Sequence, residues 1–349
     1  MQRKNIPADN YGEKMMQENI TVFEAHSESV KSKSKSPKNQ KRRLNRIENI
    51  QGICFACIPL VGFCLFTLIP ALIAFAAQFT SMNGFDLSTM EWNNFANFGK
   101  VLGDPLFWRS FGIDFFFVFA QLCSLLVAIV TAAILAQPPK TSKVFTVLFF
   151  VPQICSSVAI TLMWQQMFDY DFGIVNSVLV KLFGEGAKVN WLNESGPFLA
   201  VMFIVVVWQG PGYGILMYKA AFTNVNKSLY EAASLDGANK FQQFLHITLP
   251  AISPTTFFLV LAGINAGMQT FDVAHILGGG GSGGWTNEYG PDNSGLTTSV
   301  YIYQAGIALY DPTRGMPVAS VMSYGLFVVM LIIAIINFKF QNKWVSYDQ

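Results

Sequence analysis

Six long apolar stretches constrain the fold of this chain more than any other feature of its sequence. They run approximately over residues 53–79, 110–136, 144–168, 197–221, 253–277 and 316–338. Each is long enough for a helix to cross about 30 Å of hydrocarbon, since an α-helix rises about 1.5 Å per residue. We therefore expect an all-α, polytopic membrane protein with six transmembrane helices. Pro59, Pro70 and Pro152 lie inside the first and third stretches and predict kinks there.

The distribution of charge divides the chain into two parts. Only 13% of the residues are charged and 52% are hydrophobic, which is unusual for a soluble domain. Residues 1–50 are polar with little apolar periodicity, and residues 31–46 carry eight Lys or Arg and no acid. We expect residues 1–50 to form a disordered basic cytoplasmic tail that also contacts anionic lipid, and residues 51–349 to form the transmembrane domain.

The same charges predict the orientation in the membrane. An even number of spans places both ends on one side, and Lys and Arg concentrate in cytoplasmic loops. With the N-terminus in the cytoplasm, the inner segments hold 18 of the 23 Lys and Arg residues. The loop between the fourth and fifth stretches, residues 219–250, is then cytoplasmic, and so are the N- and C-termini.

That loop contains a polar island, residues 226–250, that predicts two short helices joined by a tight turn. Ser228 and Glu231 have the spacing of a capping box, so the first helix should begin near Ser228. Asp236-Gly237 should end it, because glycine adopts a left-handed backbone at little cost. Asn239 can cap the second helix, and Leu249-Pro250 should end it.

These residues resemble the EAA loop of binding-protein-dependent ABC importer permeases. The matching positions are Glu231-Ala232-Ala233, Asp236-Gly237-Ala238 and Ile247-Thr248-Leu249-Pro250. In that family the loop is the cytoplasmic coupling segment that docks on the ATPase subunit. The resemblance implies contacts with an ATPase chain for Glu231, Ala232, Ala233, Asp236, Gly237, Leu249 and Pro250. An ordinary helical hairpin, in which Glu231 only caps its own helix, is the alternative.

Further blocks are similar to the sugar-type, maltose or multiple-sugar branch of these type I importers, over roughly residues 50–340. They are Asp104-Pro105-Leu106-Phe107-Trp108, Phe150-Val151-Pro152, Trp164, Phe168, Asp171-Phe172-Gly173, Phe271-Asp272 and Tyr301-Ile302-Tyr303. One segment departs from the family: Gly278–Trp285 and the polar run to about Thr297 replace a short turn after the fifth span. We transfer no residue contact to that segment.

Catalytic and cofactor motifs are missing from the sequence. It has no G-x-x-x-x-G-K-[ST] phosphate loop and no H-E-x-x-H, and its three histidines are far apart. Gly278, Gly280 and Gly283 match G-x-G-x-x-G only formally, since no strand precedes them. The five cysteines lie in apolar stretches, and the C-x-x-C of Cys54 and Cys57 has no second pair. We expect no catalytic residue, metal site or cofactor, and we expect ATP hydrolysis on a separate chain.

Polar residues inside the spans are the candidates for a substrate pathway, since such residues usually face a bundle interior or a water-filled cavity. Asn265, Gln269 and Asp272 recur at i, i+4 and i+7, which predicts a polar face on the fifth span. Trp164 and Gln165 would add an aromatic face and an amide, which suit a sugar. The alternative is that these groups only hydrogen-bond helix to helix.

The resemblance implies one permease subunit of an ATP-driven importer in the bacterial inner membrane. Its expected partners are an ATP-binding ABC subunit, a second homologous permease, an extracytoplasmic solute-binding protein and a sugar or oligosaccharide, with glycerol-phosphate-type solutes also open. A secondary transporter driven by an ion gradient is one alternative, although we find no internal repeat. A membrane scaffold or sensor that does not transport is the other.

Overall fold

The computed structural model describes residues 51–82, 86–136, 142–279, 288–307 and 315–341. The expected tail, residues 1–50, lies outside the described residues, and so do most of the glycine-rich segment and the end of the chain. The chain divides into two units, Met1–Leu72 and Ile73–Gln349, and each is considered by itself. No β-strand occurs within the described ranges, and Thr80 and Trp92 form an isolated bridge. The fold is all-α, as the sequence predicts.

Five helices are long and apolar enough to cross a membrane. They are Gln51–Ala77, Pro105–Ala136, Ser195–Asn224, Ser253–Leu277 and Met316–Gln341. The first includes a π-helical turn, Cys64–Leu68, and α3, Ile69–Ala77. The π-helical turn widens the backbone just before Pro70, whose ring cannot fit a regular α-turn. The described helix continues past Pro59 and Pro70.

The third apolar stretch differs from the expected single span. It forms α6, Ser142–Ile154, and α7, Ser157–Met167, and the two helices meet at an angle of 96°. Pro152 lies in the last turn of α6, and Ser156 precedes α7 with an extended backbone. The break begins three residues after Pro152. The chain therefore bends sharply at a place where the sequence predicts only a kink in a continuous helix.

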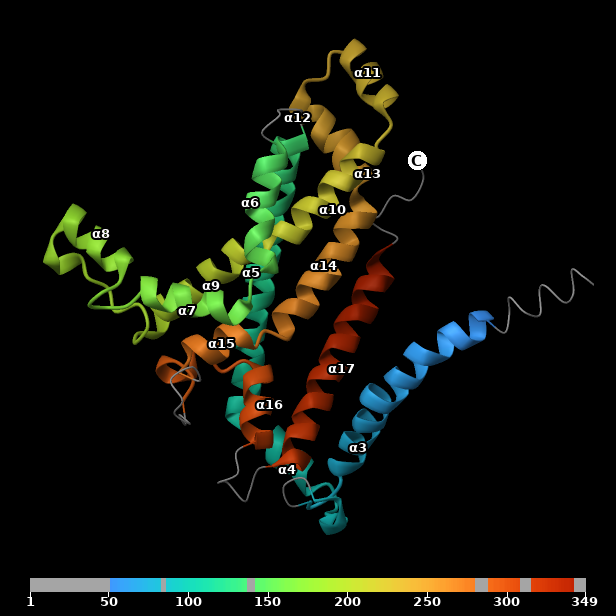
Figure 1. Cartoon of the computed structure of the whole chain (residues 1–349), viewed down its shortest axis with the longest axis vertical. Coiled ribbons are helices and arrows are strands. Elements are labelled where there is room, and N and C mark those ends of the chain that lie inside the picture. Colours follow the sequence, from blue (N-terminus) through green and yellow to red (C-terminus); the bar gives the residue numbers. More distant parts are fainter. Residues whose placement is uncertain (1–50, 83–85, 137–141, 280–287, 308–314, 342–349) are drawn as a thin grey trace, which may run out of the picture. The chain divides into compact units, whose positions relative to one another are not determined.

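The remaining elements complete the second unit around α5, Pro105–Ala136. They are η2 Leu87–Thr89, α4 Ala96–Leu102, α8 Ile174–Phe183, η3 Glu185–Ala187, α9 Ser195–Gln209, α10 Pro211–Asn224, α11 Lys227–Leu235, α12 Lys240–Gln243, η4 Phe244–Thr248, α13 Leu249–Ala251, α14 Ser253–Met268, α15 Asp272–Leu277, η6 Pro291–Asn293, α16 Thr298–Ile307 and α17 Met316–Gln341. Helices α9, α10 and α14 pack against α5, and Figure 1 shows α11, α12 and α13 together at one end of the bundle.

Glycines let these helices approach closely. A Cβ added at Gly267 in α14 would lie 2.5 Å from the Cα of Val118 in α5, and one at Gly212 in α10 would lie 2.6 Å from the backbone oxygen of Phe149 in α6. Membrane helices gain no hydrophobic stabilisation from leaving lipid, so close packing of small residues holds them together.

Two separate apolar clusters, here named the outer cluster and the inner cluster, form the core of the second unit. The outer cluster contains residues of α4, α9, α15, α16, α17 and the first half of α5, with Phe117, Phe198, Met202 and Tyr301 fully buried. The inner cluster contains residues of the second half of α5, α10 and the start of α14. Along α5 the outer cluster ends at Ala120 and the inner cluster begins at Ala128. The layer between them is the site described next.

Candidate functional site

A polar cavity of about 280 Å³ lies between the two apolar clusters. Its polar lining includes three glutamines, two hydroxyl side chains and one carboxylate: Gln121, Gln153, Gln209, Ser157, Thr270 and Asp272. Gln121 stands midway along α5, about 23 Å from either end of that helix. The cavity is therefore at the depth where a span has least access to bulk water.

Two spans are broken where they line this cavity, and a third has a glycine–proline junction there. Gln153 and Ser157 flank the break between α6 and α7, Gln209 and Gly210 stand at the junction of α9 and α10, and Thr270 lies between α14 and α15. A break leaves backbone N–H and C=O groups without helical partners, and at membrane depth such groups are tolerated only inside protein or beside water. Broken helices with free ends are also how transporters build substrate sites. The geometry thus suits a water-filled, hydrogen-bonding site.

The expected polar face of the fifth span is wrong as a single helical face. Helix α14 ends at Met268 and α15 begins at Asp272, so Asn265, Gln269 and Asp272 do not share one continuous helix. Asp272 lines the cavity. Gln269 is exposed and its Nε2 donates to Sδ of Met330 at 3.5 Å, while Asn265 is exposed outside the lining. The break thus places Asp272 at the cavity and leaves Asn265 and Gln269 outside its lining.

Trp164 and Gln165 lie on α7, away from this cavity. The Trp164 ring stacks on Phe168 with centroids 5.7 Å apart and meets Trp208 edge-on at 5.5 Å. Its Nε1 is buried without a hydrogen-bond partner in the described part of the chain. Gln165 lines a different cavity, which is larger and polar. The two residues therefore do not join Asp272 in one site.

Sequence reasoning missed Gln153, Ser157 and Gln209 as lining residues. A signal was present: Gln153 follows Pro152, and Gln209 precedes Gly210-Pro211. A polar side chain beside a helix breaker inside an apolar span marks a place where both the backbone and the side chain need polar surroundings.

The larger cavity, about 980 Å³, is formed by the segments that follow α7 and α15. Its polar side chains include Gln165, Asp169, Tyr170, Asp171, Asn190, Asn193 and Glu288. A single buried side chain, Asn176, organises the segment from Tyr170 to Trp191. Its Nδ2 donates to the backbone oxygens of Tyr170 at 3.1 Å and Val189 at 3.0 Å. Its Oδ1 accepts from the Val189 N–H at 3.2 Å and Trp191 Nε1 at 3.0 Å.

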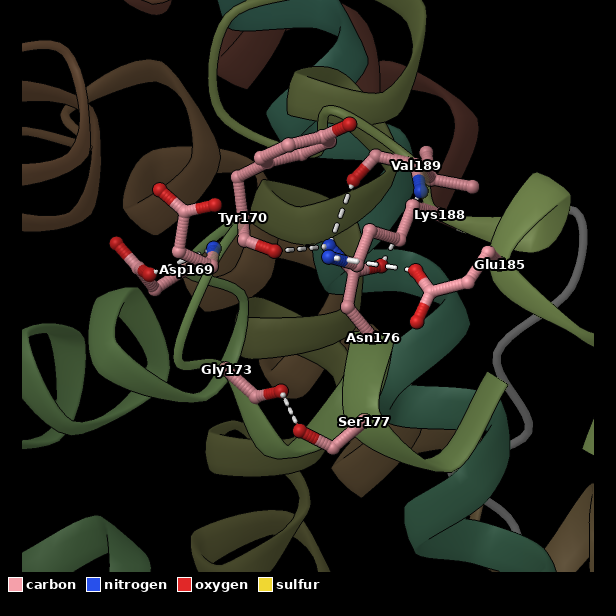
Figure 2. Close-up of polar contacts among 9 residues, drawn as sticks. Asp169, Tyr170, Gly173, Asn176, Ser177, Glu185, Lys188 and Val189 are labelled. Carbon is pink, nitrogen blue, oxygen red and sulfur yellow. Dashed lines mark hydrogen bonds and ion pairs between the residues drawn. The ribbon is translucent and has the colours of Figure 1, made fainter. Parts of the chain in front are cut away.

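Figure 2 shows Asn176 between the two ends of this segment, with Tyr170 and Val189 on either side. Lys188 forms an ion pair with Glu185 at 3.6 Å and lies 5.6 Å from the centre of the Tyr170 ring. Asn176 uses both donors and accepts two bonds, so it has no spare hydrogen-bonding capacity for a ligand. Its role is to hold Tyr170 and Asn190 at the larger cavity.

Asp114, another polar residue inside a span, is fully buried and holds two helices together. Its Oδ1 accepts from the N–H of Thr298, the first residue of α16, at 3.0 Å. Ser110 adds a hydroxyl contact with Thr298 Oγ1 at 2.8 Å. A carboxyl group at a helix N-terminus accepts from a free N–H and interacts favourably with the positive end of the helix dipole, so this residue is a structural link between α5 and α16.

The polar island forms the expected helical hairpin, with one different cap. Asn226, rather than Ser228, caps α11, and its Oδ1 accepts from Ser228 N–H at 3.0 Å. The expected box of Ser228 and Glu231 is therefore wrong, because the N-cap lies two residues earlier, although α11 does begin near Ser228, at Lys227. Asn239 caps α12 as predicted, in a reciprocal capping box with Gln242.

Gly237 ends α11 as the sequence predicts. Its φ is +83°, and Ala238 N–H bonds to Ala233 O at 2.9 Å while Gly237 N–H bonds to Ser234 O at 3.2 Å. This is the Schellman arrangement, which satisfies carbonyls that the helix end leaves free. The prediction that Leu249-Pro250 ends the second helix is wrong. A π-helical turn over Phe244–Thr248 accommodates Pro250, and α13 continues to Ala251.

The hairpin is anchored at its base and exposed at its tip. Tyr230 packs against the inner cluster, and its hydroxyl contacts Thr248 Oγ1 at 2.8 Å. Leu235 is 90% exposed and Phe241 is 69% exposed. Glu231 is also exposed and makes no ion pair with the described residues. Ala232, Asp236, Gly237, Leu249 and Pro250 are exposed as well, and Ala233 is half-buried.

Comparison with known proteins identifies the family. Residues 124–342 match the family described as "Binding-protein-dependent transport system inner membrane component". The chain belongs to this family. It is accordingly a multi-pass inner-membrane permease component, not an enzyme. The match covers the hairpin and all the cavity-lining residues except Gln121.

Relatives and a solved structure agree with the family. The chain is 34% identical over 83% of its length to the probable ABC transporter permease protein YesP of Bacillus subtilis, covering 89% of that protein. It is 30% identical over 71% of its length to the lactose transport system permease protein LacF of Rhizobium radiobacter, covering 80% of it. Its fold matches a chain from a bacterial ABC transporter that imports the acidic polysaccharide alginate, with a TM-score of 0.70, 20% identity, and coverage of 87% of this chain and all of that one.

Proposed function

We propose that this chain is the permease subunit of an ATP-driven importer that carries a sugar or oligosaccharide across the inner membrane. The observation that carries the proposal is the polar cavity at the junctions α6–α7, α9–α10 and α14–α15, between two packed apolar clusters. Amide and hydroxyl side chains both donate and accept hydrogen bonds, as sugar hydroxyls do. LacF, which is similar along most of its length, is named for lactose transport.

An alternating-access permease needs a solute site with a closable wall on each side. The outer and inner clusters supply such walls, and the cavity lies between them at mid-helix depth. Packed clusters switch between discrete arrangements rather than deform gradually, so opening one while closing the other exposes the cavity to one side at a time.

The hairpin couples this switch to an ATPase on a separate chain. Glu231 offers an exposed carboxylate, Leu235 and Phe241 offer apolar surface, and the caps at Asn226, Asn239 and Gly237 preform the surface. A preformed docking surface loses little conformational entropy on binding. Tyr230 joins the hairpin to the inner cluster, so movement of the docked ATPase reaches the cavity wall.

In this proposal the hairpin and both ends of the chain are cytoplasmic, and the larger polar cavity faces outward. The other partners are a second permease, which forms the other half of the pathway, and a solute-binding protein on the outer side. The orientation is tested with a single cysteine at position 239. An impermeant maleimide should label it in inverted vesicles and not in intact cells.

The main test is mild-detergent purification of the tagged chain from its native host, with mass spectrometry of the proteins that accompany it. An ATPase subunit and a second permease should co-purify, and Glu231→Ala or Gly237→Asp should release the ATPase. Thr223→Ala is the control, because it removes one hydroxyl contact to Ala220 O at the exposed end of α10. Recovery of the chain alone, from cells that are taking up solute, would favour an ion-driven transporter instead.

A further inference from the structure

Similarity to relatives leaves the charge of the solute open. Lactose, named for one relative, is uncharged, whereas the alginate of the structural neighbour is acidic. A charged solute requires an oppositely charged or strongly hydrogen-bonding path at membrane depth, because an unpaired charge there is costly. The side chains that line the two polar cavities therefore bear on the charge of the solute.

Resting on the proposed sugar transport, we infer that this permease carries uncharged oligosaccharides and excludes acidic or phosphorylated ones. The polar cavity of about 280 Å³ is called the central cavity here. Its described lining contains one carboxylate, Asp272, three glutamines and no Lys or Arg. A uronate or phosphate would meet Asp272 with no cation in this chain's described lining to offset the repulsion. Uncharged hydroxyls carry no such penalty and match the amides.

The larger cavity has the same character. Its described lining includes Asp169, Asp171 and Glu288 and again no Lys or Arg. Lys188 lies near the Tyr170 ring but is not part of this lining, and its ammonium is paired with Glu185 at 3.6 Å, as Figure 2 shows. A cavity lined by one sign of charge lowers the local concentration of solutes with that sign. An acidic sugar would thus be disfavoured both in the central cavity and in the larger polar cavity.

Gln153 offers a direct test in the central cavity, because replacing it by Glu or by Lys adds a negative or a positive charge at the same position. For an uncharged solute, Gln153→Glu and Gln153→Lys should lower maximal uptake to a similar extent, within about threefold of each other. For an anionic solute, the lysine variant should exceed the glutamate variant by at least about tenfold. Gln153→Asn, which keeps an uncharged amide, controls for the altered shape.

The experiment uses the full importer with its own binding protein in proteoliposomes. The matched probes are galactobiose and digalacturonic acid, which share a skeleton and differ in charge; lactose, arabino-oligosaccharides and alginate oligosaccharides are further probes. Affinity of the binding protein for each probe is measured separately, so that selection before the permease is known. We expect ATP-dependent uptake of an uncharged probe, no uptake of an acidic one, and equal effects of the two charged variants.

The outcomes separate this inference from the proposed function. ATP-dependent uptake of an acidic probe, or a lysine variant that transports at least tenfold better than the glutamate variant, overturns the inference and leaves the importer function intact. If neither class of probe is taken up or stimulates ATP hydrolysis, sugar transport itself fails. If the charged variants do not assemble, the wild-type comparison of galactobiose with digalacturonic acid still decides.

Discussion

Replacing Asn176 by alanine should loosen the segment from Tyr170 to Trp191. The side chain is 1% exposed and makes four hydrogen bonds, two as donor and two as acceptor. Alanine removes all four and leaves the Val189 N–H and Trp191 Nε1 without that acceptor. Asn176 thus joins backbone and side-chain groups that are up to 15 residues away in the sequence.

The expected size of the effect follows from those bonds. A neutral hydrogen bond contributes about 1 kcal/mol net, and a buried group left unpaired costs about 1–3 kcal/mol. The partners are only partly buried, so water recovers some of this loss. We expect the free energy of local opening to fall by about 3 kcal/mol, which corresponds to about 100-fold faster amide exchange.

Hydrogen exchange with mass spectrometry on the assembled importer in nanodiscs measures this directly. Peptides that contain Val189 should exchange about 100-fold faster in Asn176→Ala, while peptides from α5 and α14 should not change. Ser177→Ala is the matched control. Ser177 is the residue after Asn176 in α8, and its hydroxyl donates one hydrogen bond to Gly173 O at 2.9 Å. Exchange at Val189 within about twofold of wild type would show that Asn176 does not hold this segment.

Three further outcomes are expected. Gly267→Leu should abolish a monodisperse protein on size-exclusion chromatography, because even a Cβ would lie 2.5 Å from Val118, whereas Gly263→Ala, whose Cβ has 3.8 Å of space, should not. Gly237→Asp should insert at wild-type levels on immunoblots yet lose uptake: its Cβ meets nothing within 4 Å, and the left-handed backbone costs only about 1–2 kcal/mol. Normal uptake would end the coupling role. Trp164→Phe should leave thermal stability unchanged or slightly higher, because it removes a buried donor without a partner and keeps a stacking ring; a large loss would reveal a partner for that indole.

The hairpin shows how far local sequence rules extend. Gly237 and Asn239 are correctly predicted, because a left-handed position and a reciprocal cap depend on neighbours within a few residues. Asn226 and Ser228 are both good N-caps, so sequence alone could not choose between them. The structure selects Asn226, and this leaves the Glu231 side chain free at the surface.

The helix breaks show where those rules stop. Apolar residues lie on both sides of the break between Ile154 and Ser157, so a hydropathy window joins α6 and α7 into one span. Likewise, helical spacing places Asn265 and Asp272 on one face only if the helix continues between them, and it ends at Met268. Whether a chain breaks at such points depends on the packing of α10 on α6, of α15 on α7 and of α5 on α14, which periodicity does not encode.

The hairpin and the central cavity, which were predicted independently from the sequence, are both connected to the inner cluster. Tyr230 and Ile247 attach the hairpin to it, and Leu259 joins it to the cavity wall, which continues along α14 to Ala266. In the proposed mechanism, a force on the hairpin therefore acts first on the side chains of the inner cluster.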